Sequence, residues 1–119
     1  TVILGDVAKR LDNGALFDVT DAAAEVERAE RLEITPSGPL FGKDMRRAAH
    51  AAAEHEERIL ATNGIAWSAL EKSRLLGSRR AARVLLAEFS CREAEEGLWI
   101  SFRLSKGSYA TVVLREFAR

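Results

Sequence analysis

A run of basic side chains lies between residues 72 and 83, with no acidic residue among them. Its members are Lys72, Arg74, Arg79, Arg80 and Arg83. Lysine and arginine bind nucleic-acid phosphates through their charge and through the release of counterions. The run therefore predicts contacts to a phosphate backbone. The alternative is a solvated surface that binds no ligand.

A second basic group, Lys43, Arg46 and Arg47, falls where a helix is expected to begin. Asp44 offers a carboxylate oxygen that can cap this helix. The start of a helix favours anions, because its first N–H groups have no partners inside the helix and its dipole is positive there. We therefore predict a second phosphate contact beside these residues.

The other reactive side chains indicate neither a metal site nor a nucleophile. His50 and His55 are five residues apart, whereas a metal-binding pair on a helix needs a spacing of four, so no metal site is predicted. Cys91 is the single cysteine, which excludes an internal disulfide and favours a reduced, cytoplasmic protein. Trp67 and Trp99 are expected to pack, with stacking on a nucleic-acid base as the alternative.

The composition is that of a small soluble domain. The chain has 119 residues, of which 47% are hydrophobic and 30% are charged, and its net charge is zero. A zero net charge argues against a dedicated nucleic-acid module, which usually has a basic excess. No apolar stretch approaches the roughly 18 residues that cross a bilayer, so no membrane association is predicted. The chain starts at Thr1, and we expect it to be a fragment of a longer protein.

The first residues predict a short β-ribbon. Residues 2–4 are apolar and are expected to end a strand before a turn, and residues 15–19 form a second β-type run. Asn13 and Gly14 precede that run, and the pair Asn-Gly is a strong turn signal.

A helix and a proline-rich segment follow. Thr20 or Asp21 can cap a helix over residues 22–32, whose Glu and Arg residues predict a solvated face with ion pairs between turns. Residues 35–39 hold both prolines of the chain, which forbid a helix, and we expect an ordered loop or hinge there.

Two further helices are predicted over residues 45–62 and 68–76. In the first of them, apolar side chains and one histidine recur at spacings of three and four and predict a buried face: Met45, Ala48, Ala52, His55 and Ile59.

In the last third of the chain, apolar side chains recur with a period of two. Residues 82–89 and 98–104 are expected to be strands of a hairpin that turns at residues 95–97, and residues 109–117 are expected to form a final helix. The fold class is therefore α+β, with a short β-ribbon, a helical middle, a β-hairpin and a C-terminal helix.

Three segments in this order resemble TruD-type transfer-RNA pseudouridine synthases. Residues 35–43, TPSGPLFGK, are similar to the family's "TGPL-aromatic-GK" loop, which precedes a helix with a Glu-Glu pair, here Glu56-Glu57. Residues 78–83, SRRAAR, are similar to its "ERRAAR" stretch, and residues 105–116, SKGSYATVVLRE, to its terminal "AGSYATxVLREL".

The resemblance implies the isomerisation of uridine to pseudouridine in tRNA without a cofactor. In this family an aspartate acts on the ribosyl-uracil linkage, and the target base must leave its stack to enter a pocket. Residues 1–80 correspond to the later part of an inserted domain, and residues 81–119 to the terminal segment of the catalytic domain. The partners implied are tRNA and the remaining catalytic part of the enzyme.

The segments in which this family keeps its catalytic aspartate and its base-stacking aromatic, "GxKDRxAxTxQ" and "NxFGxQRFG", do not occur in the chain. Asp44, in Gly42-Lys43-Asp44, is assigned to a helix cap, since the spacing differs and no Thr-x-Gln follows. We therefore name no catalytic residue and predict that the chain alone is inactive.

The terminal segment also resembles the "KGTYIR" motif of other pseudouridine synthases, whose arginine pairs with the catalytic aspartate. Thr111 stands at that arginine's position, so this role does not carry over. The turn and the tyrosine remain, and we expect this segment to shape the floor of the active site: Lys106, Gly107, Ser108 and Tyr109.

Two alternatives stay open. The chain can be a non-catalytic module that binds structured RNA, or a fragment that self-associates as a homodimer through the open strand edges of its terminal hairpin.

Overall fold

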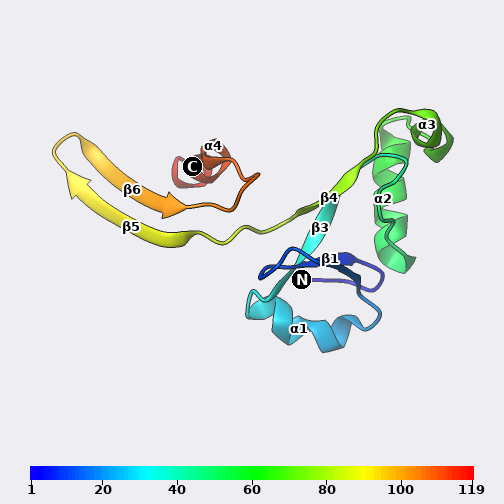
Figure 1. Ribbon diagram of the computed structural model, residues 1–119, viewed down its shortest axis with the longest axis horizontal. Coiled ribbons are helices and arrows are strands. Elements are labelled where there is room, and N and C mark those ends of the chain that lie inside the picture. Colours follow the sequence, from blue (N-terminus) through cyan, green and yellow to red (C-terminus); the bar gives the residue numbers. More distant parts are fainter. The chain divides into compact units, whose positions relative to one another are not determined.

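The computed structural model describes residues 1–119, which form two compact units, Thr1–Arg83 and Val84–Arg119 (Figure 1). Unit 1 contains β1 (Val7–Arg10), β2 (Leu16–Asp18), α1 (Ala22–Glu30), β3 (Ile34–Leu40), α2 (His50–Thr62), α3 (Trp67–Lys72) and β4 (Ser78–Ala81). Unit 2 contains β5 (Ala87–Ala94), β6 (Gly97–Arg103) and α4 (Ala110–Phe117). The predicted α+β class is confirmed. No helix has the length and hydropathy that a membrane span requires.

Unit 1 is built on one antiparallel sheet with the strand order β2-β1-β3-β4. The predicted ribbon is confirmed as β1 and β2, although its first strand is Val7–Arg10 and not residues 2–4. The side chain of Asn13 closes the turn, since its Oδ1 accepts a hydrogen bond from Ala15 N at 2.9 Å.

The proline segment is the middle of β3, so the prediction of a loop or hinge is wrong. β3 pairs with β1 up to Pro36 and with β4 from Ser37 onward, so each ladder covers only one half of the strand. The carbonyl of Pro36 accepts a hydrogen bond from Ala82 N at 2.9 Å. The nitrogen of Pro36 faces the same edge of β3, and it lies beyond the last residue of β4 that pairs with β3. A proline is tolerated in a strand where no ladder needs its missing N–H.

α1 packs against this sheet and is capped as predicted. The Asp21 carboxylate accepts from Ala23 N at 3.0 Å and from Ala24 N at 3.2 Å. The cluster beneath the helix joins its Ala29 to residues of the sheet and of the flanking loops: Val2, Ala8, Val19 and Ile34.

Asp21→Ala is expected to lower the free energy of unfolding by about 1 kcal/mol, because both N–H groups lose their acceptor. Asp44→Ala is the matched control, since it removes a carboxylate that caps no helix, and it should cost less than about 0.5 kcal/mol. Urea unfolding followed by circular dichroism measures both variants, and equal losses would contradict the cap.

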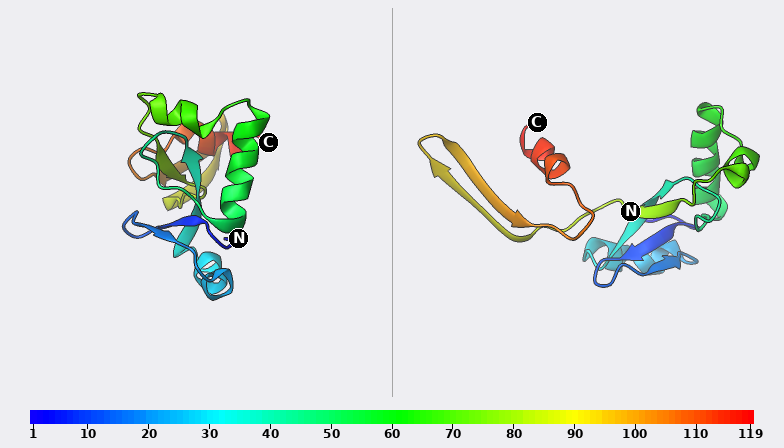
Figure 2. Two further views of the ribbon diagram at one scale, coloured as in Figure 1. Left: turned by 90° about the vertical axis from the view of Figure 1, so that its right-hand side faces the viewer. Right: turned by 45° about the horizontal axis from the view of Figure 1, so that its top comes forward.

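α2 begins at His50 and not at Met45, so the predicted cap by Asp44 is wrong. Its N-cap is Ala49, whose N–H donates to Gly5 O at 2.9 Å. This tertiary contact holds the preceding residues in an irregular path and delays the helix. α3 follows at one end of α2 (Figures 1 and 2).

The buried face of α2 also differs from the prediction. It consists of Ala52, Glu56 and Leu60, while His55 and Ile59 are exposed. The apolar pattern failed because a charged residue, Glu56, occupies the centre of the buried face.

Of the predicted strand over residues 82–89, only residues 87–89 are strand, and residues 82–86 have no regular structure. β4 ends at Ala81, and β5 starts only at Ala87. Between the two strands, the backbone N–H of Arg83 donates to Thr35 Oγ1 at 3.1 Å, a contact within unit 1.

Unit 2 confirms the predicted hairpin and final helix. β5 and β6 pair in one antiparallel ladder, and Phe117 of α4 stacks on Phe89 with 5.8 Å between the ring centroids. A bulge interrupts the ladder between Ala87 and Ser90, where Glu88 has a φ of 52°. No residue of this unit is buried.

Candidate RNA-binding surface

The segment between β3 and α2, residues 41–49, has no regular structure yet is held firmly within unit 1. Lys43 N donates to Leu75 O at 2.9 Å, and Asp44 N donates to Leu76 O at 2.8 Å. Met45 is buried. The 41–49 loop therefore lies side by side with the segment between α3 and β4, and the two form one surface.

The ion pair between Arg79 and Glu56 is the most buried one in the chain. Arg79 Nη2 lies 3.0 Å from Glu56 Oε2 and Nη1 lies 2.5 Å from Oε1, while Arg79 Nε donates to Arg46 O at 2.8 Å. The Arg79 side chain is 1% exposed, so it cannot reach a phosphate while this pair holds. The structure gives it another role, which is to join β4 to α2 and to the 41–49 loop.

Arg46, predicted to bind phosphate, is also bound by protein groups. Its guanidinium forms a bidentate ion pair with the Asp18 carboxylate, in which Nε lies 3.0 Å from Oδ1 and Nη2 lies 2.9 Å from Oδ2. Its Nη1 donates to Leu16 O at 2.9 Å. These contacts fasten the 41–49 loop to β2.

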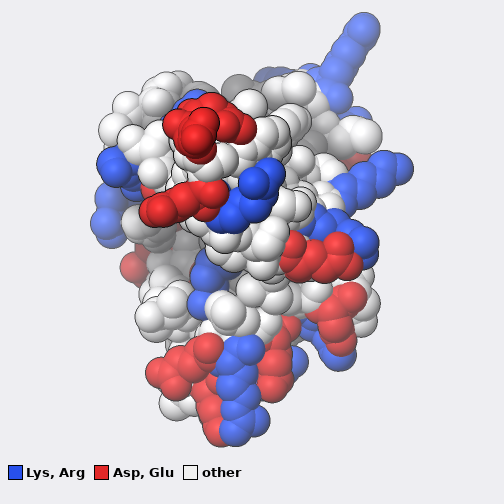
Figure 3. All heavy atoms as spheres, turned by 90° about the vertical axis from the view of Figure 1, so that its left-hand side faces the viewer, with Lys and Arg blue, Asp and Glu red and all other residues white.

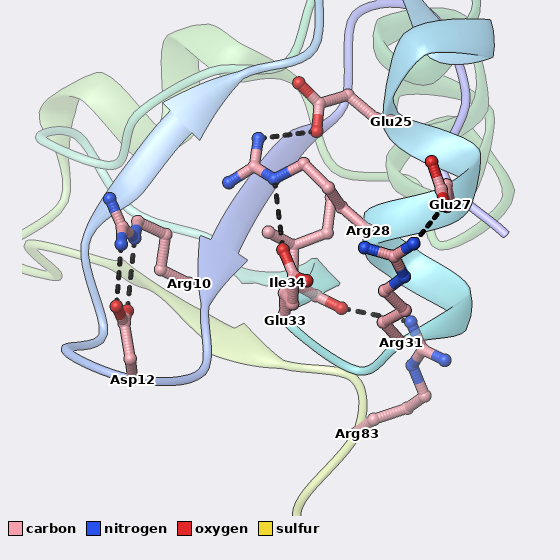
Figure 4. Close-up of polar contacts among 9 residues, drawn as sticks. All are labelled: Arg10, Asp12, Glu25, Glu27, Arg28, Arg31, Glu33, Ile34 and Arg83. Atoms are coloured by element: carbon pink, nitrogen blue, oxygen red, sulfur yellow. Dashed lines mark hydrogen bonds and ion pairs between the residues drawn. The ribbon is translucent and has the colours of Figure 1, made fainter.

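Arg83 closes the C-terminal end of α1. Its Nη2 donates to the carbonyl of Ile34 (Figure 4) and to that of Ala29, both at 3.1 Å. A cationic side chain at the end of a helix satisfies carbonyls that have no partner within it. Arg83 Nε is buried without a hydrogen-bond partner.

The predicted ion pairs on α1 are confirmed (Figure 4). Arg28 Nη1 lies 2.7 Å from Glu25 Oε2, and Arg31 pairs with Glu27 one turn earlier. α1 therefore has no basic excess that would favour RNA. Acidic and basic side chains are also interspersed in Figure 3, which views the molecule from the side on which Figure 1 draws unit 2.

Arg47 lies over the ring of Trp67, with 3.9 Å between its guanidinium carbon and the ring centroid. Its Nη2 also donates to Glu71 Oε1 at 3.2 Å. Phe41 meets Trp67 edge to face, with 5.9 Å between the centroids. We call these four residues the Arg47 platform. Sequence spacing could not reveal it, because it joins the 41–49 loop to α3.

The remaining basic residues of the prediction are exposed: Lys43, Lys72, Arg74 and Arg80. Lys43 belongs to the 41–49 loop and Arg74 to the segment that is hydrogen-bonded to it. Lys72 ends α3, and Arg80 lies on β4. Of the eight predicted residues, three therefore bind distant parts of unit 1 through their guanidinium groups: Arg46, which is still exposed, Arg79 and Arg83.

The predicted pocket-shaping residues form the turn between β6 and α4. Gly107 has a φ of +89°, and Ser108 N donates to Ser105 O at 3.1 Å. Tyr109 directly precedes α4 and is 61% exposed. Their contribution to an active site stays a prediction.

Comparison with known proteins gives consistent matches over almost the whole chain. A family model described as tRNA pseudouridine synthase D (TruD) matches residues 1–117. The tRNA pseudouridine synthase D of an Anaeromyxobacter species is 44% identical over 121 residues, which cover 100% of this chain and 34% of that protein. The one from Thermus thermophilus is 50% identical over 115 residues, 97% of this chain and 32% of the relative.

A solved structure shares the fold. The crystal structure described as that of a tRNA pseudouridine synthase D from Methanosarcina mazei superposes with a TM-score of 0.68 at 26% identity, over 98% of this chain and 31% of the other. The fold is thus one found among pseudouridine synthases. The chain belongs to the tRNA pseudouridine synthase D (TruD) family, as the resemblance implied. It spans about one third of the length of these relatives.

Proposed function

We propose that this chain takes part in the isomerisation of uridine to pseudouridine in tRNA, as one part of a TruD-type enzyme in the cytoplasm. The observation that carries the proposal is the family match over residues 1–117. The catalytic aspartate belongs to residues outside this chain, because the family segment that holds it has no counterpart here. No cofactor is required.

In this proposal, residues 1–80 are the later part of the inserted domain, and residues 81–119 return to the catalytic domain. The division into compact units after Arg83 supports it. So does the exposure of large apolar side chains in unit 2, such as Leu98 at 58% and Trp99 at 53%. A two-stranded hairpin is marginal on its own and needs a further surface, which the rest of the catalytic domain would supply.

The exposed basic residues of unit 1 would bind tRNA phosphates in this scheme: Lys43, Lys72, Arg74 and Arg80. The turn from Lys106 to Tyr109 would lie at the floor of the active site.

The test is tritium release from tRNA labelled at uridine C5, because that hydrogen is lost when the base rejoins ribose through C5. The chain alone, in large excess, should release no tritium above a control without protein, and it should bind the same tRNA less tightly as salt is raised. The Thermus thermophilus relative serves as the positive control.

Release by the chain alone would contradict the assignment of the catalytic aspartate, and Asp44→Asn would be the first variant to assay. Absence of both release and tRNA binding would contradict the proposed role of unit 1. Salt-sensitive binding without release, and without any gain when the remaining enzyme is supplied as a second chain, would favour a non-catalytic RNA-binding module.

A further inference from the structure

We propose that the Arg47 platform binds one unpaired RNA nucleotide, whose base stacks on the face of the Arg47 guanidinium turned away from Trp67. This inference rests on the proposed function for the identity of the nucleic acid. The nucleotide is not the uridine that reacts, since the scheme above assigns the platform, which lies in unit 1, to the inserted domain and the active site to the catalytic domain.

The first argument is that the guanidinium is already held in place. Trp67 supports one face at 3.9 Å, and Glu71 fixes the edge through a 3.2 Å hydrogen bond. Phe41 in turn packs against the Trp67 ring. An exposed arginine normally loses side-chain entropy when it binds, and this loss is reduced where the side chain is ordered beforehand.

The second argument is that the platform remains accessible. The Arg47 side chain is 50% exposed although it contacts Trp67 and Glu71. A flat, delocalised cation with one open face is a suitable surface for an aromatic base.

The third argument is the distribution of charge. Glu71 offsets the charge of Arg47, which makes Arg47 a poor contact for a phosphate by itself. Lys43 and Arg74 lie on the two adjoining segments, and Lys72 ends α3 directly before the second of them. None of the three forms an ion pair of unit 1. The arrangement therefore fits a nucleotide whose base meets Arg47 and whose neighbouring phosphates meet these three cations.

The fourth argument concerns the kind of RNA. A base within a helix has both faces covered by its neighbours, so only a base from a loop, a bulge or an end can stack on a side chain. Such stacking tolerates any sequence, because every base has a π-face. The platform thus recognises an unpaired nucleotide and not a particular base.

The experiment compares two probes, an oligonucleotide of eight uridines and the same oligonucleotide with abasic residues. The probes share their phosphates and differ only in the bases. The wild-type chain should bind the uridine probe about tenfold more tightly, by the usual size of one stacking contact. Arg47→Lys keeps the charge but removes the planar group, and it should bind both probes equally.

Arg31→Lys is the matched control, since Arg31 also pairs with a glutamate on a helix but lies over no ring, and it should keep the preference. Equal binding of the two probes by the wild-type chain would overturn the platform and leave the proposed function intact. An unchanged preference in Arg47→Lys would do the same. If the wild-type chain binds neither probe and no tRNA, the RNA contact of the proposed function fails as well.

Discussion

Replacing Arg79 by Met should lower the free energy of unfolding of unit 1 by about 3–5 kcal/mol, the usual cost of removing one partner of a buried ion pair. The variant leaves the Glu56 carboxylate, 10% exposed, without its cationic partner. It also removes the donor to Arg46 O. Three parts of unit 1 are joined at this one guanidinium: β4, α2 and the 41–49 loop.

Urea unfolding followed by Trp67 fluorescence measures this loss, in a Trp99→Phe background that leaves one reporter. Arg74→Met is the control, an exposed arginine of the same unit, with an expected change within about 0.5 kcal/mol. The double variant Arg79→Met and Glu56→Met should recover much of the stability, because no buried charge is then left alone. A loss below about 1 kcal/mol in Arg79→Met would contradict the structural role of the pair.

Gly42→Ala should cost about 3 kcal/mol, at the upper end for a side chain forced into a packed site. A Cβ at Gly42 would lie 2.2 Å from Gly77 N and 2.4 Å from Leu76 C. Both obstacles are backbone atoms, which cannot rotate away as a side chain can. The 41–49 loop would have to separate from its neighbour, and affinity for RNA should fall together with stability.

Variants of three further glycines distinguish the cost of a close backbone contact from the cost of a positive φ. Gly77→Ala combines the close approach, 2.6 Å to Gly42 N, with a φ of +79°, and should cost about 1 kcal/mol more than Gly42→Ala. Gly64→Ala has a φ of +68° and open space, and should cost only about 1 kcal/mol. Gly38→Ala has neither constraint and should be nearly neutral. Equal losses in Gly42→Ala and Gly38→Ala would show that the close approach is not maintained in solution.

The sequence predicted the elements whose causes are local. A cap at Asp21, a turn at Asn13 and a period of two in residues 98–104 each depend on neighbours within a few positions, and all three are present. The proline segment was misassigned because its pairing with β1 and β4 is set by residues far away in the chain. Local rules treat two prolines as a break, whereas both lie within β3, Pro36 at a position where no ladder needs its missing N–H.

In the candidate site, too, local features could be predicted from the sequence and contacts between distant residues could not. Residue type alone selected eight basic side chains, but it could not tell that Arg79 would meet Glu56 inside unit 1. The one available signal was the Glu-Glu pair that the family resemblance placed on the following helix. The stacking of Arg47 on Trp67 had no such signal, since neither side chain is unusual at its own position.

The bulge in β5 bears on how copies of the chain can meet. A strand that added to the outer edge of β5 would lose register between Ala87 and Ser90, where Glu88 pairs with Arg103 at 2.9 Å. Bulges and charged side chains of this kind protect sheet edges from intermolecular pairing and aggregation. The edge of β6 has no such interruption from Gly97 to Ser101. If the hairpin does recruit another strand, from a second copy or from the rest of the enzyme, β6 is therefore the edge that accepts it.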